Sequence, residues 1–251
     1  MRSARVFFGH MPLAFRLALR EMRGGLSGFY IFLACIALGT AAIAAVNSVA
    51  GSVTGAMQEQ GQTILAGDIR FQINNRTVAP EEEAYFRSFG PVSRSDTIRS
   101  MARKGDGSDQ TLAEVKAVDD AYPLYGALQF DPQASVPDAL AQKDGAFGAI
   151  AAPDLLDRLK VKTGDRLLLG NATLTITGTL VKEPDALSEG FNFAPRLIIS
   201  RAALDAAGLV QTGSLVEHVF RVKLPAGQAV AADLKKKTDA AFPNAGIRIA
   251  T

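Results

Sequence analysis

Hydrophobic and polar positions divide the chain into a long apolar stretch near the N-terminus and a mixed region after it. No charged residue occurs between residues 24 and 58, and residues 29–46 are apolar apart from Thr40. A bilayer core of roughly 30 Å is crossed by about 20 apolar helical residues. The pattern therefore predicts a transmembrane helix over residues 29–53.

The segment before this stretch has the pattern of an interfacial helix. Arg16, Arg20 and Arg23 follow one another at helical spacing, which places them on one stripe that would face lipid phosphates. Phe29 and Tyr30 stand where an aromatic membrane-interface anchor is expected. The arginine excess upstream predicts that residues 1–28 are cytoplasmic and that the main domain is periplasmic, by the positive-inside rule.

The predicted span contains a row of small residues. Ala37, Ala41 and Ala45 recur every four residues, a spacing that lets helices pack closely in lipid. The alternative is an anchor that is merely rich in alanine. A cleavable signal peptide is a further alternative, but the 28-residue leader and the long apolar stretch disfavour it. Cys35, in the middle of the span, is interpreted as an inert apolar residue.

The mixed region alternates between strand and helix patterns. Strands are predicted over residues 68–73, 92–102, 111–118, 166–169, 172–181, 196–200, 217–224 and 247–249, and helices over residues 80–89, 153–159 and 230–241. Both ends of the region read strand–helix–strand. The order predicts an α+β fold, in which residues 54–119 and 213–251 form a ferredoxin-like lobe and residues 120–212 an inserted β-rich lobe.

Composition and charge exclude several classes of protein. Hydrophobic residues make up 48% of the 251 positions and charged residues 21%, which excludes a disordered or low-complexity chain. A net charge of +2 disfavours a basic nucleic-acid-binding protein. The single cysteine excludes an intrachain disulfide.

Motifs for enzymatic chemistry are missing from the sequence. It contains no phosphate-binding P-loop, no G-x-S-x-G nucleophile elbow and no H-E-x-x-H pair. Asp119 and Asp120 are assigned a structural role in a turn. His218 lies in a strand pattern in which no candidate partner can be identified, and it is interpreted as a surface or rim histidine. We therefore predict a non-catalytic chain with no catalytic, cofactor-binding or metal-binding residue.

Five segments carry a resemblance to a known family: KAVDDAYPLYG (116–126), KTGD (162–165), GNATLTITG (170–178), EPD (183–185) and APRL (194–197). In this order and spacing they resemble bacterial ABC transporter permeases of the FtsX/MacB-like superfamily. Within it they are most similar to the YbbP-like permeases of esterase- and lysophospholipase-associated operons. The leader LALREMRGG before an alanine-rich span is also similar.

The resemblance implies a permease subunit of the bacterial inner membrane, without cofactor or catalytic residues. Its implied partners are a cytoplasmic ATP-binding cassette subunit, further permease helices or a second permease copy, membrane lipid, and a periplasmic esterase or substrate carrier. Such permeases convert ATP-driven helix movement into movement of periplasmic domains, here on a hydrophobic or lipid-like substrate. Since the sequence stops at Thr251, before a second transmembrane helix, we expect the N-terminal part of such a permease.

Two other functions are carried as alternatives. One is a single-span, membrane-anchored periplasmic interaction or scaffold protein that recruits or regulates a partner. The other is a membrane-anchored hydrolase, which the missing nucleophile motif disfavours.

Overall fold

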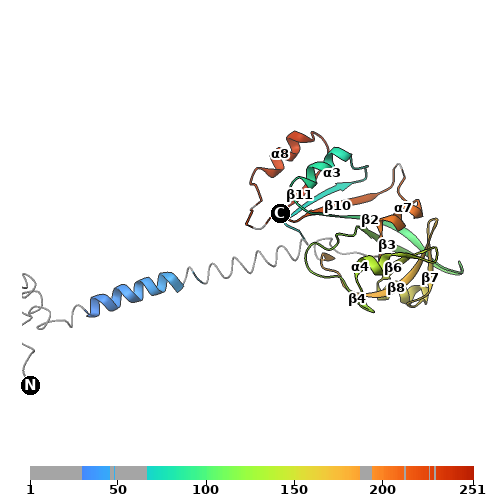
Figure 1. Cartoon of the computed structure of the whole chain (residues 1–251), viewed down its shortest axis with the longest axis horizontal. Helices are drawn as coiled ribbons and strands as arrows, with labels where there is room; N and C mark the ends of the chain where they lie inside the picture. Colours follow the sequence, from blue (N-terminus) through green and yellow to red (C-terminus); the bar gives the residue numbers. More distant parts are fainter. Residues whose placement is uncertain are drawn as a thin grey trace, which may run out of the picture. The chain divides into compact units, whose positions relative to one another are not determined.

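The computed structural model describes residues 30–45, 48, 67–186, 194–211, 213–225, 227–228 and 230–251 (Figure 1). The chain divides into two compact units, Met1–Gln58 and Glu59–Thr251. Arg16, Arg20, Arg23 and Phe29 lie outside the described residues.

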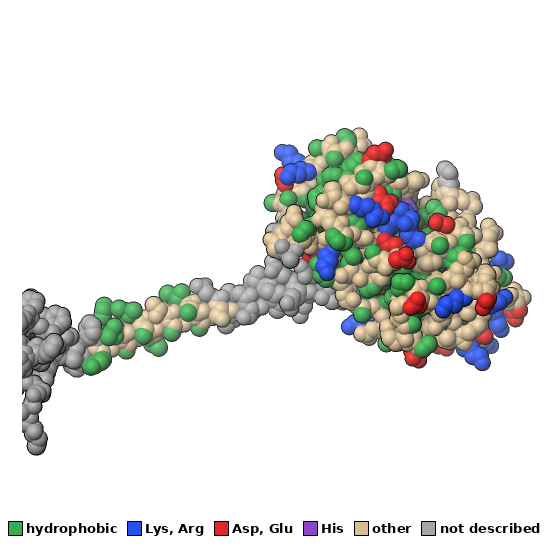
Figure 2. Space-filling model, viewed as in Figure 1, with side chains coloured by type: hydrophobic (Ala, Val, Ile, Leu, Met, Phe, Trp, Pro, Cys, Tyr) green, Lys and Arg blue, Asp and Glu red, His purple; other side chains and the backbone are tan. Residues whose placement is uncertain are grey.

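The described part of the first unit is a helix over residues 30–45, whose visible side chains are largely hydrophobic (Figure 2). Its residues are exposed, including Tyr30 and the row Ala37, Ala41 and Ala45. The hydroxyl of Thr40 donates to the carbonyl oxygen of Ile36 at 2.9 Å, so the polar group of this helix is bonded within it. None of the described helices combines the length and the apolar character needed to cross a membrane. Residues 29, 46, 47 and 49–53 of the span predicted over residues 29–53 lie outside the described residues.

The second unit is built on a mixed β-sheet. Its strands are β1 (Ile69–Asn74), β2 (Val92–Lys104), β3 (Gln110–Val118), β4 (Gln129–Asp131), β5 (Gln142–Lys143), β6 (Ala146–Ala151), β7 (Arg166–Leu169), β8 (Ala172–Lys182), β9 (Arg196–Ser200), β10 (Val216–Val222) and β11 (Arg248–Ala250). Its helices are α3 (Pro80–Arg87), α4 (Val136–Leu140), α5 (Pro153–Leu159), α7 (Arg201–Ala207) and α8 (Leu234–Ala241). The predicted α+β class is confirmed.

One part of the sheet has the order β11-β1-β10-β2. Helix α3 connects β1 to β2 and α8 connects β10 to β11, so two strand–helix–strand units interleave, as in ferredoxin-like layers. Figure 1 shows α3 and α8 together beside these strands, and one hydrophobic cluster joins them through Phe86 of α3, Leu234 of α8, and Phe71 and Phe220 of the strands. The ring of Phe71 stacks on that of Phe86 with centroids 4.3 Å apart.

The strands of residues 120–212 continue the same sheet. β9 pairs with β3 in parallel, and β7 pairs with β2 in antiparallel fashion. A second hydrophobic cluster lies under α5 and α7, with Leu155, Leu197 and Leu204 among its members. The division of the domain at residues 120 and 212 stays a prediction.

The turns follow from local chemistry. Gly170 has a positive φ of 54° at the β7–β8 hairpin, where Leu169 pairs with Ala172 across the two-residue Gly-Asn turn. Gly148 of β6 passes so close to the carbonyl oxygen of Ala139 that a Cβ would lie 1.9 Å from it. Helix α4 can therefore rest directly on β6.

Candidate functional site

Charged side chains of the second unit gather in two clusters on opposite faces of the sheet. The pairing of β2 with β3 sets Lys116 opposite Thr97 on one face, whereas the adjacent Asp96 points to the other face. The ion network consists of Ser95, Glu114, Lys116, Tyr122, Glu183, Asp185, Arg196 and Arg221. The histidine cluster consists of Glu83, Arg87, Arg94, Asp96, Arg201 and His218.

Lys116 is at the centre of the ion network and is completely buried. Its Nζ donates to Glu183 Oε1 at 2.5 Å and to Asp185 Oδ2 at 2.7 Å. Tyr122 donates to Asp185 Oδ1 at 2.6 Å, and Arg221 pairs with the other oxygen of Asp185 at 2.5 Å. The network therefore satisfies a carboxylate that has no contact with water.

The network extends along the sheet through Arg196. The Nε of this residue donates to Glu183 Oε2 at 3.1 Å, and its Nη1 lies 3.2 Å from Glu114 Oε2. Three cations thus face three carboxylates, each with a side chain at most 8% exposed. A buried set of this kind is costly to disrupt by removal of one member, because the remaining charge has no solvent to stabilise it.

Electrostatics in the network favour the ionised carboxylate. Burial opposes ionisation of Asp185, but the Lys116 ammonium and the Arg221 guanidinium outweigh it and hold the pKa of Asp185 well below its ordinary value. Burial, together with Asp185 and Glu183, raises the pKa of Tyr122 well above its ordinary value, so Tyr122 stays a donor.

The ion network is made largely of the segments that carry the family resemblance. Lys116 and Tyr122 belong to KAVDDAYPLYG, Glu183 and Asp185 to EPD, and Arg196 to APRL. Sequence reasoning singled out the segments but missed that they meet. The available signal was a lysine at a buried position within an apolar strand, which requires a partner.

The KAVDDAYPLYG segment also reaches the start of the domain. Tyr125 donates to Asp68 Oδ2 at 2.8 Å, and the same oxygen accepts the backbone N–H of Leu224 at 2.7 Å. Burial and the neighbouring Asp68 raise the pKa of Tyr125 to about 12. One loop therefore connects the ion network to the beginning of β1 and the end of β10.

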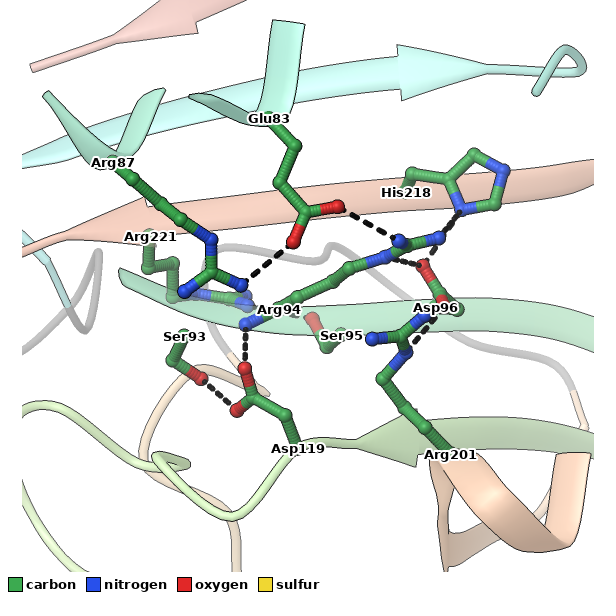
Figure 3. Close-up of polar contacts among 10 residues, drawn as sticks. All are labelled: Glu83, Arg87, Ser93, Arg94, Ser95, Asp96, Asp119, Arg201, His218 and Arg221. Carbon is green, nitrogen blue, oxygen red and sulfur yellow. Dashed lines mark hydrogen bonds and ion pairs between the residues drawn. The ribbon is translucent and has the colours of Figure 1, made fainter. Parts of the chain in front are cut away.

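The histidine cluster lies between α3, β2, β10 and α7 (Figure 3). His218 Nδ1 lies 2.6 Å from Asp96 Oδ1, which also accepts from Arg94 Nε at 3.0 Å. Arg201 Nε donates to the other Asp96 oxygen at 3.2 Å. On the α3 side, Glu83 accepts from Arg87 at 2.6 Å and from Arg94 at 3.4 Å.

The prediction of a surface or rim histidine is wrong. His218 is 5% exposed, and β10 pairs with β2 so that His218 stands opposite Asp96. Burial opposes ionisation of Asp96, but His218 and Arg94 prevail and lower its pKa. Because Asp96 accepts at Nδ1, the proton of the imidazole is placed on that nitrogen.

Asp119 has a structural position in the turn after β3. Its carboxylate accepts from Ser93 Oγ at 3.0 Å and from the backbone N–H of Arg94 at 2.7 Å. Burial raises the pKa of Asp119 despite these bonds. This geometry agrees with the turn role assigned from the sequence.

A cleft of about 830 Å³ lies beside the histidine cluster. It is lined by Asn75, Arg76, Thr77, Val78, Arg94, Val210, Gln211, Gly213, Ser214, Val216 and His218. Figure 2 shows basic, acidic and histidine side chains gathered on this face of the domain. In the described parts of the chain, no group of three or more His, Cys, Asp or Glu residues could hold a metal ion.

Comparison with known proteins gives a family match over most of the chain. The family described as MacB-like periplasmic core domain matches residues 30–240. The uncharacterized ABC transporter permease YbbP of Escherichia coli K12 is 36% identical over 188 residues, which cover 74% of this chain and 22% of that protein. The chain thus spans about a fifth of the length of this curated relative.

Two solved structures of transporter domains match part of the chain at low identity. The periplasmic region of MacB from Actinobacillus actinomycetemcomitans matches with a TM-score of 0.47 at 9% identity, covering 76% of this chain and 91% of that one. The extracellular domain of the ABC-type transporter YknZ from Gram-positive bacteria matches with a TM-score of 0.47 at 11% identity, covering 73% and 100%.

Proposed function

Because the chain belongs to the family of MacB-like periplasmic core domains, we propose that it is the N-terminal part of an ABC transporter permease subunit. The family match over residues 30–240 is the observation that carries this proposal, and the identity to a permease supports it. In this role the chain performs no chemistry itself. It couples ATP hydrolysis by a separate cytoplasmic ATPase to movement of the periplasmic domain, which acts on a hydrophobic or lipid-like substrate.

The proposed placement is the bacterial inner membrane, with the N-terminus in the cytoplasm and residues 54–251 in the periplasm. The uncharged stretch of residues 24–58 and the arginines before it support this placement. Arg16, Arg20, Arg23, Phe29 and Tyr30 are proposed to contact the membrane interface. Further partners are other permease helices or a second permease copy, and a periplasmic esterase or substrate carrier.

Transmission of movement requires a domain that moves as one body. The ion network supports this, because it fixes the 116–126 segment and the 183–185 segment to the centre of the sheet. The bond between Tyr125 and Asp68 fixes the same loop to the start of β1. A displacement of β1 would therefore reach the strands of residues 120–212.

The proposal is tested with the full-length permease and its ATPase in lipid nanodiscs. A donor fluorophore at Lys235→Cys, in a Cys35→Ser background, reports energy transfer to labelled lipid. Lys235 is exposed on α8, so the label should not disturb the fold. Addition of ATP should change the transfer efficiency. With an ATPase that cannot hydrolyse ATP, the efficiency should not alternate between the two values. Equal efficiency in all nucleotide states would refute the coupling.

Replacement of Ala37, Ala41 and Ala45 by Leu tests the packing row separately. These residues lie four apart on the described helix. If they pack against other permease helices, the substitution should reduce ATP turnover and co-purification of a second copy. Unchanged assembly and turnover would favour the single-span interaction protein.

A further inference from the structure

The cleft beside the histidine cluster has an unusual distribution of charge. Its described lining includes Arg76, Arg94 and His218 and no carboxylate. Arg76 pairs with Glu82, and Arg94 pairs with Asp96 and Glu83. The side chains of Glu82 and Asp96 are 4% and 5% exposed and that of Glu83 is 26% exposed, and none of the three belongs to the described lining. A ligand in the cleft therefore meets the cations first.

His218 is oriented into this cleft by its partner. His218 belongs to the cleft lining, and its Nδ1 lies 2.6 Å from Asp96 Oδ1, so Nε2 is the ring nitrogen left for a ligand; Figure 3 shows it pointing away from Asp96. Nε2 has no hydrogen-bond partner among the residues that the structure describes. An N–H group at Nε2 would donate a hydrogen bond to an anion, while the opposite ring nitrogen stays paired with the Asp96 carboxylate.

The two arginines contribute differently. All donor atoms of Arg76 are engaged, with Glu82 at 2.6 and 2.7 Å and with the carbonyl oxygens of Ala245 and Thr77, so Arg76 acts only through its charge. Arg94 uses Nε for Asp96 and Nη1 for Glu83. Its remaining N–H groups lie next to His218, with Nη2 at 3.4 Å from the ring.

The rest of the lining is partly apolar. Val78 packs against the cluster of Phe71 and Phe86, and Val210, also in the lining, is 47% exposed. Small-molecule sites typically have volumes of about 300–1,000 Å³, and this cleft falls in that range at about 830 Å³. The cleft therefore combines an anion-binding end with an apolar surface.

We infer that this cleft binds an amphiphile with an anionic head group. The head group contacts His218 Nε2 and Arg94, and the apolar chain lies along Val78 and Val210. As a statement of the permease's substrate class, this inference rests on the proposed function. The binding itself requires neither ATP nor a partner.

Isothermal titration of the full chain with hexyl phosphate tests the inference. Inorganic phosphate and hexanol are the two comparison probes, since each carries one half of the amphiphile. Hexyl phosphate should bind at least tenfold more tightly than either one. If inorganic phosphate binds as tightly as hexyl phosphate, the cleft is a site for free phosphate, and the inference of an amphiphilic ligand is overturned.

Two variants and a control locate the ligand. His218→Asn keeps a donor for Asp96 but removes Nε2, and it should weaken hexyl phosphate binding about tenfold. Val210→Ser should weaken hexyl phosphate and leave inorganic phosphate unchanged. Lys235→Gln removes a distant exposed charge on α8 and should have no effect.

Chemical shifts of the backbone amides check that each variant is folded and show where the probe binds. Shifts confined to residues 75–78 and 210–218 support the inference. The inference is overturned if hexyl phosphate does not bind, or if its affinity falls equally in the Lys235→Gln and His218→Asn variants. Because no nucleotide is present, a failure here is distinct from a failure of ATP coupling in the nanodisc experiment.

Discussion

Removal of the central cation of the ion network should be among the most destabilising single changes in the chain. Lys116→Met keeps most of the side chain's volume, so the cavity cost is small. The substitution leaves Glu183 and Asp185 without the ammonium group now 2.5 and 2.7 Å away. Two cations would then face three buried carboxylates. Breaking a buried ion pair in this way costs about 3–5 kcal/mol.

Urea denaturation followed by far-ultraviolet circular dichroism measures this cost. With a slope of about 2 kcal/mol per molar urea, the loss lowers the midpoint by about 1.5–2.5 M. Lys235→Met is the matched control. Lys235 pairs with Asp239 at 2.9 Å, but its side chain is 76% exposed, and a pair of this kind contributes at most about 0.5 kcal/mol.

The pH dependence of the same variant distinguishes electrostatics from packing. In Lys116→Met one carboxylate can take up a proton, which removes the surplus negative charge. The deficit relative to wild type should therefore be smaller at pH 5 than at pH 8. A midpoint change below about 0.5 M, or a deficit that does not vary with pH, would show that the network is not held together by charge.

Three more predictions concern other parts of the domain. Tyr122→Phe removes the hydroxyl that donates to the buried carboxylate of Asp185 at 2.6 Å. It should lower the free energy of unfolding, measured by urea denaturation, by about 1–3 kcal/mol. The pKa values of Asp96 and Asp185 are lower in the folded than in the unfolded state, so both carboxylates stabilise the fold above their unfolded pKa. This stabilisation should be lost as the pH falls through their folded pKa values, and a titration of ellipticity with acid measures the loss. The loss of stability on acidification should be smaller in Asp96→Asn. Gly148→Ala would place a Cβ 1.9 Å from the carbonyl oxygen of Ala139. It should lower the thermal midpoint more than Gly107→Ala, which meets no atom within 4 Å and costs only the strain of its positive φ of 73°.

The strands and helices found from the sequence are those with clear boundaries. A proline at the first turn marks α3 and α5, and Gly170 with Asn171 separates the two predicted strands that pair as β7 and β8. The structure contains all four elements. These signals are local, because each acts on the backbone of its own or the next residue. Residue order is sufficient to find them.

The missed elements lack such signals. Strand β6 has the sequence AFGAIA, a small apolar run without alternation that does not distinguish a strand from a helix. Helix α7 follows β9 without a connecting loop, with Ser200 both as the last residue of the strand and as the helix N-cap. No turn residue separates this helix from the strand before it, so the sequence does not indicate where the helix starts.

The two clusters could not be predicted because their members are distant in sequence. Lys116 and Asp185 are 69 residues apart, and His218 and Asp96 are 122 apart. Sheet register brings them together, and register depends on the whole hydrophobic pattern. A buried lysine or histidine in a strand pattern predicts that a partner exists and leaves its identity open.

The position of β1 determines how the domain would respond to a force applied at Gly67, two residues before this strand begins. β1 is hydrogen-bonded on both sides, to β10 over six register positions and to β11 over three. Tension applied at Gly67 along the strand axis would load both ladders in shear, so many bonds would have to fail together instead of opening one after another. Such an attachment can carry mechanical load into the sheet without unravelling at its edge.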